Sequence, residues 1–253
     1  MGLFSEDELK IYEWQLDLPG FGREGQERLK NTTALVSRVG GLGGAVCYSL
    51  AAAGIGRMIL AHAGPLRAND LNRQILMTHA HVGLPRVTRA AQRLRDLNPY
   101  VEVEAHDCNI TTENARDLVG RSDIVFDCAP IFPERFAMNR ACVELGKPMI
   151  EAAVFGMEGQ VTTVLPQRSP CLACLYPEDP PAWKRRFPVL GAVSALAAAI
   201  AATEGVKVLT GLGETLAGTL LYFNAATMSF RRIPIARRPD CAVCGHGSQD
   251  RGS

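Results

Sequence analysis

Two patterns of apolar residues alternate along the chain: a helical period of about 3.6 residues, and continuous apolar runs typical of buried strands. The helical pattern predicts helices at residues 5–18, 23–31, 43–53, 86–97, 112–120, 133–145 and 189–203. The apolar runs predict strands at residues 33–37, 57–61, 101–105, 124–127, 148–152, 159–165, 220–224 and 228–233. Strands and helices alternate as far as residue 165, so the pattern favours an α/β, Rossmann-type fold with a mostly parallel sheet and flanking helices. The last two strands predict an antiparallel C-terminal extension.

The length of 253 residues suits one large α/β domain or two small ones, and the chain is predicted to be a single domain over residues 1–253. We expect four parts: an N-terminal helical arm at 1–32, a Rossmann core at 33–165, a C-terminal part at 166–246 that contains two pairs of cysteines, and a flexible tail at 247–253.

Charge and composition argue against several classes of partner. The formal net charge is +1, so neither nucleic acid nor a membrane surface is expected to bind. Short basic clusters at residues 184–186, 231–232 and 237–238 are interpreted as a solvated rim or, alternatively, as local sites for phosphate or an acidic tail. The apolar stretch 189–203 is shorter than the roughly 20 residues of a bilayer span, so we expect a helix buried in the core or at a subunit interface.

Eight cysteines fall into two groups. Four of them, Cys47, Cys108, Cys128 and Cys142, stand among apolar neighbours and are interpreted as small buried side chains. Scattered thiols together with an acidic N-terminal segment that lacks an apolar signal favour a cytoplasmic location.

The other four cysteines form two Cys-x-x-Cys pairs, at Cys171 and Cys174 and at Cys241 and Cys244. Two residues between cysteines let both thiolates reach one tetrahedral ion, and four thiolates leave no open position for a substrate. The pairs therefore predict one structural Zn²⁺ that ties the C-terminal end back to the loop near residue 170. Two unrelated pairs, or redox-active motifs, are the alternatives.

A glycine-rich turn follows the first predicted strand. In Arg38-Val-Gly40-Gly41-Leu-Gly43 the second and third glycines of a dinucleotide fingerprint are present, and the first is replaced by Arg38. The start of the following helix would offer free N–H groups to a phosphate. The turn thus predicts nucleotide binding, against the alternative of a purely structural turn.

The acid that holds a ribose hydroxyl about 20 residues after this fingerprint is absent. The second strand ends at His62, which would hydrogen-bond a ribose or serve only a structural purpose. This argues against an ordinary NAD dehydrogenase. An NADP oxidoreductase that uses Arg67 for the 2′-phosphate is a third, weaker hypothesis, because no acid/base pair with suitable spacing stands out.

These motifs together resemble the MoeB/ThiF/HesA superfamily, which is related to ubiquitin-activating enzymes. The matching segments are Leu18–Gly22, Asp70-Leu-Asn-Arg73-Gln74, Val82–Arg86, Asp127-Cys128 with Arg135 and Asn139, Met157–Gln160 and the two cysteine pairs. Within the superfamily the segments Asp70–Met77, Asp127–Ala129, Pro133–Arg135, Pro148–Ala153 and Phe187–Ser194 are most similar to HesA of nitrogen-fixation clusters.

The resemblance implies that ATP adenylates the C-terminal glycine of a ubiquitin-like carrier protein, and for HesA it implies a role in molybdenum supply. It also implies a homodimer, with a ubiquitin-like small protein or a nitrogenase-assembly protein as partner. The residues carried over as ATP-binding are Gly40, Gly41, Gly43, His62, Asp70, Arg73, Gln74, Arg86 and Asp127. Among them Arg73 and Arg86 are assigned to phosphate and transition-state charge.

Several family residues are replaced in this chain. Pro130 stands where the family carries its magnesium-binding Asp, and Trp14 stands where an Arg reaches ATP from the partner subunit. His62, Gly64, Arg86 and Ile131 replace two acids, a Lys and an Asn. No cysteine lies between the two metal-binding pairs, so the ThiF-type catalytic thiol is missing. Two hypotheses follow: an ATP-binding adenylyltransferase relative with a degraded, magnesium-poor site, or an inactive homodimeric scaffold that binds a nucleotide, an oxyanion or a partner's C-terminal tail.

Overall fold

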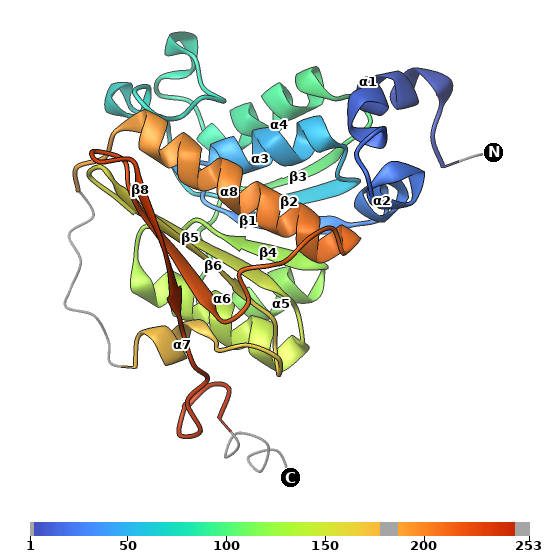
Figure 1. Ribbon diagram of the computed structural model, residues 1–253. Helices are drawn as coiled ribbons and strands as arrows, with labels where there is room; N and C mark the ends of the chain where they lie inside the picture. Colours follow the sequence, from blue (N-terminus) through green and yellow to red (C-terminus); the bar gives the residue numbers. More distant parts are fainter. Residues whose placement is uncertain (1–2, 178–186, 246–253) are drawn as a thin grey trace.

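The computed structural model describes residues 3–177 and 187–245 and shows one continuous sheet with helices on both of its faces (Figure 1). The helices are α1 (Glu6–Leu16), α2 (Gly22–Lys30), α3 (Gly41–Ala53), α4 (Arg86–Leu97), α5 (Ala115–Gly120), α6 (Phe132–Leu145), α7 (Leu172–Leu175) and α8 (Gly191–Thr210). The strands are β1 (Thr33–Ser37), β2 (Arg57–Ala61), β3 (Glu102–His106), β4 (Ile124–Asp127), β5 (Met149–Phe155), β6 (Glu158–Val164), β7 (Thr219–Asn224) and β8 (Ser229–Pro234). Two short 3₁₀ turns, Ala68–Asp70 and His79–His81, connect β2 to α4.

The sheet has eight strands in the order β3-β2-β1-β4-β5-β6-β7-β8. The pairs from β3 to β5 are parallel, and those from β5 to β8 are antiparallel. The predicted α/β architecture, with a mostly parallel sheet and an antiparallel C-terminal extension, is therefore confirmed. Strands β2 and β3 are added on one side of β1, and β4 and the later strands are added on the other side. The order of the strands therefore reverses between β1 and β4, and open α/β sheets bind their ligands at such a point.

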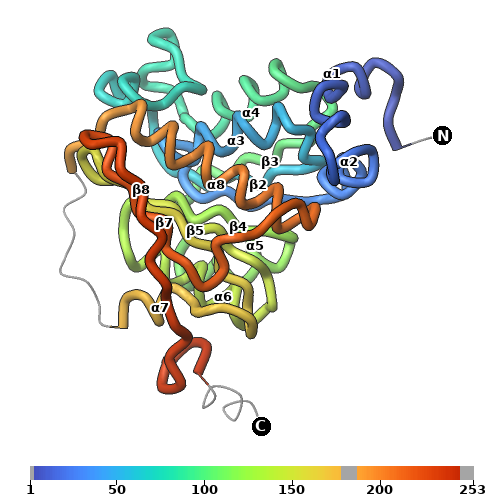
Figure 2. The backbone as a smooth tube through the Cα atoms, in the orientation of Figure 1, coloured from blue at the N-terminus to red at the C-terminus, as the bar shows by residue number. Residues whose placement is uncertain are grey.

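Helices cover both faces of the sheet (Figures 1 and 2), and a hydrophobic layer packs on each face. One layer packs α3, α4 and α8 against the strands. The other packs α5, α6 and the cysteine pairs against the opposite face. The strands of the parallel half are buried on both sides, which explains why they read in the sequence as continuous apolar runs.

Local signals in the sequence explain several helix ends. Ser5 caps α1, since its hydroxyl accepts a hydrogen bond from the Glu8 amide at 3.1 Å. Gly54 ends α3 with φ +83°, a left-handed conformation that glycine adopts without strain. α3 begins at Gly41, two residues before the predicted start, and α5 begins at Ala115 rather than at residue 112.

The apolar helix α8 is longer than predicted. It runs to Thr210 rather than to residue 203, so the inference that this stretch is too short to span a bilayer was wrong. Among the described residues, α8 is the one helix whose length and composition would allow it to cross a membrane. Here α8 lies along α3 and the sheet, with Ala197, Ala198 and Ala201 buried, and this packing accounts for its apolar character.

The expectation that the scattered cysteines are buried is confirmed for three of the four. The described cysteines are all free of disulfide bonds, and Cys47, Cys128 and Cys142 are buried as predicted, whereas Cys108 is only half-buried. The basic cluster at 184–186 and the tail at 247–253 lie outside the described residues.

Candidate functional site

A cavity of about 1130 Å³ opens at the carboxyl ends of the parallel strands. Its walls come from the residues that follow β1, β2 and β4, from the β5–β6 hairpin and from the segment that leads into α8. The cavity therefore occupies the crevice between β1 and β4, at the point where the strand order reverses.

The glycine loop forms one wall of the cavity, and each glycine has a different role. Gly40 caps α3, and Gly41 is its first helical residue. A Cβ on Gly43 would lie 2.2 Å from the carbonyl oxygen of Arg38, so only glycine allows the helix to approach the strand this closely. A Cβ on Gly41 would instead lie 2.9 Å from the Arg73 side chain, which is flexible. The amides that open α3 thus border the cavity in the arrangement that suits a phosphate.

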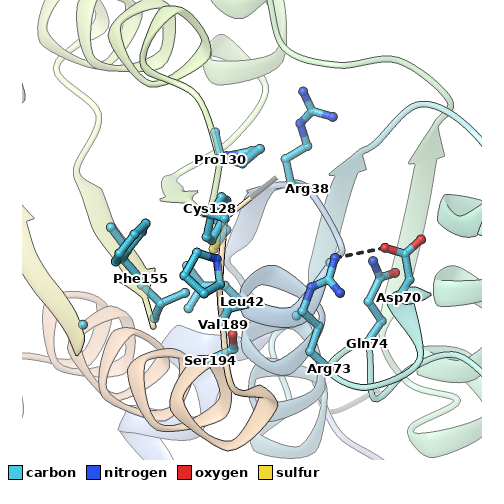
Figure 3. A pocket seen from close by; sticks show the side chains of 18 of the residues that line it. Arg38, Leu42, Asp70, Arg73, Gln74, Cys128, Pro130, Phe155, Val189 and Ser194 are labelled. Atoms are coloured by element: carbon cyan, nitrogen blue, oxygen red, sulfur yellow. Dashed lines mark hydrogen bonds and ion pairs between the residues drawn. The ribbon is translucent and has the colours of Figure 1, made fainter. Parts of the chain in front are cut away.

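Two arginines that share one acid line the cavity beside this loop, and Figure 3 shows Arg73 with the acid, Asp70. Asp70 Oδ1 is 3.0 Å from Arg73 Nη2, and Asp70 Oδ2 is 3.3 Å from Arg86 Nη2. The Arg86 guanidinium also donates to the carbonyl oxygens of Gly64 and Pro65. Two guanidinium groups against one carboxylate leave this corner of the cavity with net positive charge, which favours an anionic ligand.

Gln74 adds a polar group to the same wall. Its side chain is only 3% exposed, and among the described residues its Oε1 has no hydrogen-bond partner. A buried acceptor without a partner is costly, so this oxygen suits a ligand that brings a hydroxyl or amino group.

The opposite end of the cavity contains a buried network centred on Arg135. Arg135 Nη1 lies 3.2 Å from Asp127 Oδ2 and 2.8 Å from Glu151 Oε1. Gln160 donates from Nε2 to Glu151 and to the hydroxyl of Tyr176. Burial raises the pKa of Asp127 to about 7, against the opposing influence of Arg135. Burial likewise raises the pKa of Glu151.

The structure brings most of the predicted nucleotide-binding residues to one cavity. Those that line it are Gly40, Gly41, His62, Asp70, Arg73, Gln74 and Arg86. Gly43 lies within the first turn of α3. Asp127 is fully buried behind the cavity floor and contacts two residues that line the cavity, the Arg135 side chain and the Ala129 amide. Arg67, the residue considered for a 2′-phosphate, also lines the cavity.

Sequence reasoning assigned no site role to several lining residues, namely Arg38, Arg135, Glu151, Gln160 and Tyr176. Glu151 lies within an apolar strand, and a lone acid in such a run is a signal of a buried ion pair. Tyr176 carries no such signal, because only the path of the chain after α7 brings it to the cavity.

The four cysteines of the two Cys-x-x-Cys pairs meet beside α7, in the hydrophobic layer that also contains α5 and α6. Their sulfur atoms all lie within 4.8 Å of one another, with 3.7 Å between Cys171 and Cys241 and 3.4 Å between Cys174 and Cys244. Although burial opposes it, hydrogen bonds from the Cys244 and Val243 amides lower the pKa of Cys241 to about 7. Four converging sulfurs suit a tetrahedral ion such as Zn²⁺.

Comparison with known proteins identifies the family. A model of the ThiF family matches residues 12–243. The chain belongs to the ThiF family. This ThiF-family chain is 49% identical to Protein HesA of Leptolyngbya boryana over 239 residues, which cover 94% of this chain and 86% of that protein. It is 39% identical to the sulfur carrier protein adenylyltransferase of Thermus thermophilus over 251 residues, covering 96% and 93%.

The fold is shared with a solved structure of Escherichia coli MccB. That chain superimposes with a TM-score of 0.84 at 21% identity, covering 96% of this chain and 74% of MccB. At this identity the likeness shows the fold alone. The predicted resemblance to the MoeB/ThiF/HesA superfamily is confirmed, and the chain is an adenylyltransferase-like member of it.

Proposed function

We propose that this ThiF-family chain binds ATP in the cavity at the strand ends and acts in metallocofactor or sulfur-carrier chemistry through a degraded adenylation site. The observation that carries the proposal is the combination, in one cavity, of the N-terminus of α3 with the cationic Arg73–Asp70–Arg86 corner. Both features suit a polyphosphate.

The size of the cavity supports a second reactant. Pockets for one drug-sized ligand measure about 300–1000 Å³, and this cavity is larger, at about 1130 Å³. The space near Glu151, Gln160 and Tyr222 is therefore available to the extended C-terminal tail of a small carrier protein.

The names of the relatives give the direction of the chemistry. One relative is a sulfur carrier protein adenylyltransferase, and another is HesA. We propose a ubiquitin-like small protein or a nitrogenase-assembly protein as partner, and molybdenum supply for nitrogenase cofactor assembly as the biological role. A homodimer, a cytoplasmic location and the division into an arm, a core and a zinc-stapled part belong to the same proposal.

The residue roles are proposed as follows. Arg73 and Arg86 answer the charge of the phosphates, while Gly40, Gly41 and Gly43 shape the phosphate loop. His62, Asp70, Gln74 and Asp127 complete the nucleotide site. One structural Zn²⁺ is held by Cys171, Cys174, Cys241 and Cys244. A Mg²⁺ in the nucleotide site is doubtful, because Pro130 replaces the acid that the family is expected to use for it.

An inactive scaffold that binds a nucleotide, an oxyanion or a partner tail is the second candidate. The hydrogen bonds of Asp70 and Asp127 favour this candidate. The carboxylate oxygens of both residues already accept hydrogen bonds from arginine side chains and backbone amides, so they are not free to bind a metal ion. Apart from the four cysteines, the described residues contain no group of three or more His, Cys, Asp or Glu side chains that would hold a metal ion.

Calorimetric titration of ATP tests the nucleotide site. Gly41→Asp places a carboxylate at the phosphate loop and against Arg73, so we expect ATP binding to be lost. Gly120→Asp is the matched control, because Gly120 is exposed at the end of α5 and a Cβ there meets only Leu145, at 3.8 Å. Unchanged ATP affinity in a folded Gly41→Asp protein would show that the loop is only a turn.

A further inference from the structure

Arg38 occupies the position at which the glycine loop leaves β1. Its φ of +63° lies in the left-handed region, which non-glycine residues adopt rarely. Its side chain is 12% exposed and lines the cavity. An arginine in a conformation that suits glycine, at the entrance of a phosphate loop, indicates that the guanidinium has a use there.

Glu134 holds the Arg38 guanidinium across the crevice. Arg38 Nε is 2.7 Å from Glu134 Oε2, and Arg38 Nη2 is 2.7 Å from the same oxygen. Glu134 lies in the first turn of α6 and is 2% exposed in its side chain. Arg38 follows β1 and Glu134 follows β4, so this ion pair bridges the two strands between which the ligand crevice opens.

The pairing uses only one edge of the guanidinium. Glu134 accepts from Nε and Nη2, and no described residue accepts a hydrogen bond from Nη1. A guanidinium carries five donors in a planar fork, so the Nη1/Nη2 edge keeps donors for a bidentate contact with a phosphate. Figure 3 shows the Arg38 side chain extending away from Arg73 and Asp70.

Four acids in or behind the cavity walls are engaged by arginines, whereas Glu158, which also lines the cavity, accepts a hydrogen bond from Asn224. Asp70 contacts Arg73 and Arg86, Glu134 contacts Arg38, and Asp127 and Glu151 contact Arg135. Apart from the four cysteines, the described residues form no group of three or more His, Cys, Asp or Glu side chains for a divalent ion, so the guanidinium groups are the main source of positive charge for a ligand.

We propose that Arg38 is a phosphate-binding residue that acts as a built-in cation, so that the nucleotide is bound without a divalent metal ion. Glu134 holds the guanidinium at the entrance of the glycine loop. Arg38, Arg73 and Arg86 then surround the phosphate chain from both sides of α3's N-terminus. This inference rests on the proposed function for its nucleotide, but the anion contact itself does not.

Calorimetry with ATP and with tripolyphosphate, in excess Mg²⁺ and in EDTA, tests the proposal. For the unaltered protein we expect the ATP dissociation constants in the two conditions to agree within about threefold. Arg38→Gly alone would leave Glu134 buried and unpaired, so the variant is Arg38→Gly combined with Glu134→Gln, in which glycine also suits the left-handed φ.

The double variant is expected to weaken both ligands about tenfold or more, in both conditions, because it removes a charged hydrogen bond to phosphate. Glu134→Gln alone is expected to leave Arg38 free for the phosphate and to bind at least as tightly as the unaltered protein. Arg116→Gln is the matched control, because Arg116 is an exposed arginine of α5 that pairs with Glu144 outside the cavity.

The outcomes distinguish the role of Arg38 from the proposed nucleotide function. Loss of binding in EDTA, or unchanged affinity in the folded double variant, overturns the role of Arg38 and leaves the nucleotide site standing. If tripolyphosphate binding depends on Arg38 but ATP binds no more tightly than tripolyphosphate, the proposed nucleotide function is wrong and the role of Arg38 stands. Binding of neither ligand by the unaltered protein overturns both.

Discussion

Arg135 Nη1 lies 2.8 Å from Glu151 Oε1 at the floor of the cavity, although these residues are only 6% and 1% exposed. The same nitrogen also contacts Asp127, so one buried guanidinium serves two buried carboxyl groups. Two carboxylates and one guanidinium leave one negative charge unbalanced in a region of low dielectric. Binding one proton removes this unbalanced charge. We expect the proton on Asp127, because burial raises the pKa of Asp127 to about 7.

Asp127 should therefore make folding stability depend on pH. Its pKa is about 7 in the folded chain and about 3.9 in an unfolded one. The folded state binds the proton more tightly, so the stabilisation is complete below about pH 4 and is lost as the pH rises through about 7. Between these two pKa values the free energy of unfolding falls by about 1.4 kcal/mol per pH unit, because unfolding releases one proton. Urea unfolding between pH 5 and pH 8 measures it, and Asp127→Asn should show a smaller fall. Parallel curves for the two proteins would contradict the assignment.

The cysteine cluster predicts one zinc per chain. Four sulfurs within 4.8 Å of one another need only small shifts to reach Zn–S bonds of about 2.3 Å. Cys241→Ala should lose the metal and loosen the end of the chain, because Cys241 joins it to the α7 segment. Cys108→Ala is the matched control, since Cys108 is half-buried and lies outside the cluster. Elemental analysis with thiol titration decides: much less than one zinc per chain, with all four thiols reactive in the folded protein, would contradict the site.

Exposed apolar side chains on α1 predict a homodimer. Trp14 is 90% exposed, and Ile11, one turn earlier on the same helix, is 47% exposed. A large apolar side chain this exposed favours a covered state, and two-fold dimers are the most frequent closed assemblies. Light scattering at micromolar concentration should give the mass of a dimer, and Trp14→Lys should shift it toward the monomer. Lys10→Gln, on the same helix, is the control. A monomeric unaltered protein would refute the prediction.

The sequence was most informative where the determinants are local. The periodicity of β1, the glycines of the loop and the two cysteine pairs each depend on close neighbours, and the structure brings the loop and the cysteines to the expected places. The end of α8 was missed because the continuous apolar run stops at residue 203, where the charged Glu204 follows. In the structure Glu204 is 3% exposed in its side chain and accepts hydrogen bonds from Thr163 Oγ1 and the Leu216 amide, each at 2.7 Å. Those partners are distant in sequence, so no local pattern reveals them.

The roles of Arg38 and Glu134 have the same origin. The two residues share no sequence motif, because 96 positions separate them in the sequence. Only the meeting of β1 and β4 at the centre of the sheet brings them together. Sequence reasoning saw Arg38 as a missing glycine, whereas the structure shows a paired arginine at the entrance of the cavity.

ATP binding without efficient adenylation is the final prediction. A triphosphate carries roughly four negative charges, and attack at the α-phosphorus places more charge on its oxygens, so the reaction needs preorganised positive charge. The resemblance to the family implies that Pro130 replaces a magnesium-binding Asp and that Trp14 replaces an Arg that would enter from the partner subunit. Asp70 and Asp127 offer no substitute, because their oxygens are already hydrogen-bonded to arginines and backbone amides.

Each lost charge contact costs about 2.7–4 kcal/mol, or 10²–10³ in rate, and two together about 10⁴–10⁶ if the costs add. Ground-state binding survives such losses, because the loop and the remaining arginines still contact the phosphates, whereas the transition state loses contacts of its own. We therefore expect slow or undetectable ATP–pyrophosphate exchange with a Gly-Gly-ended small protein, in samples that bind ATP by calorimetry. Pro130→Asp should raise exchange in the presence of Mg²⁺, and Pro130→Asn, which has nearly the same shape without the charge, should not. Rapid exchange by the unaltered protein would mean that a carboxylate leaves its arginine partner to hold the metal, and the weakened-site proposal would be wrong.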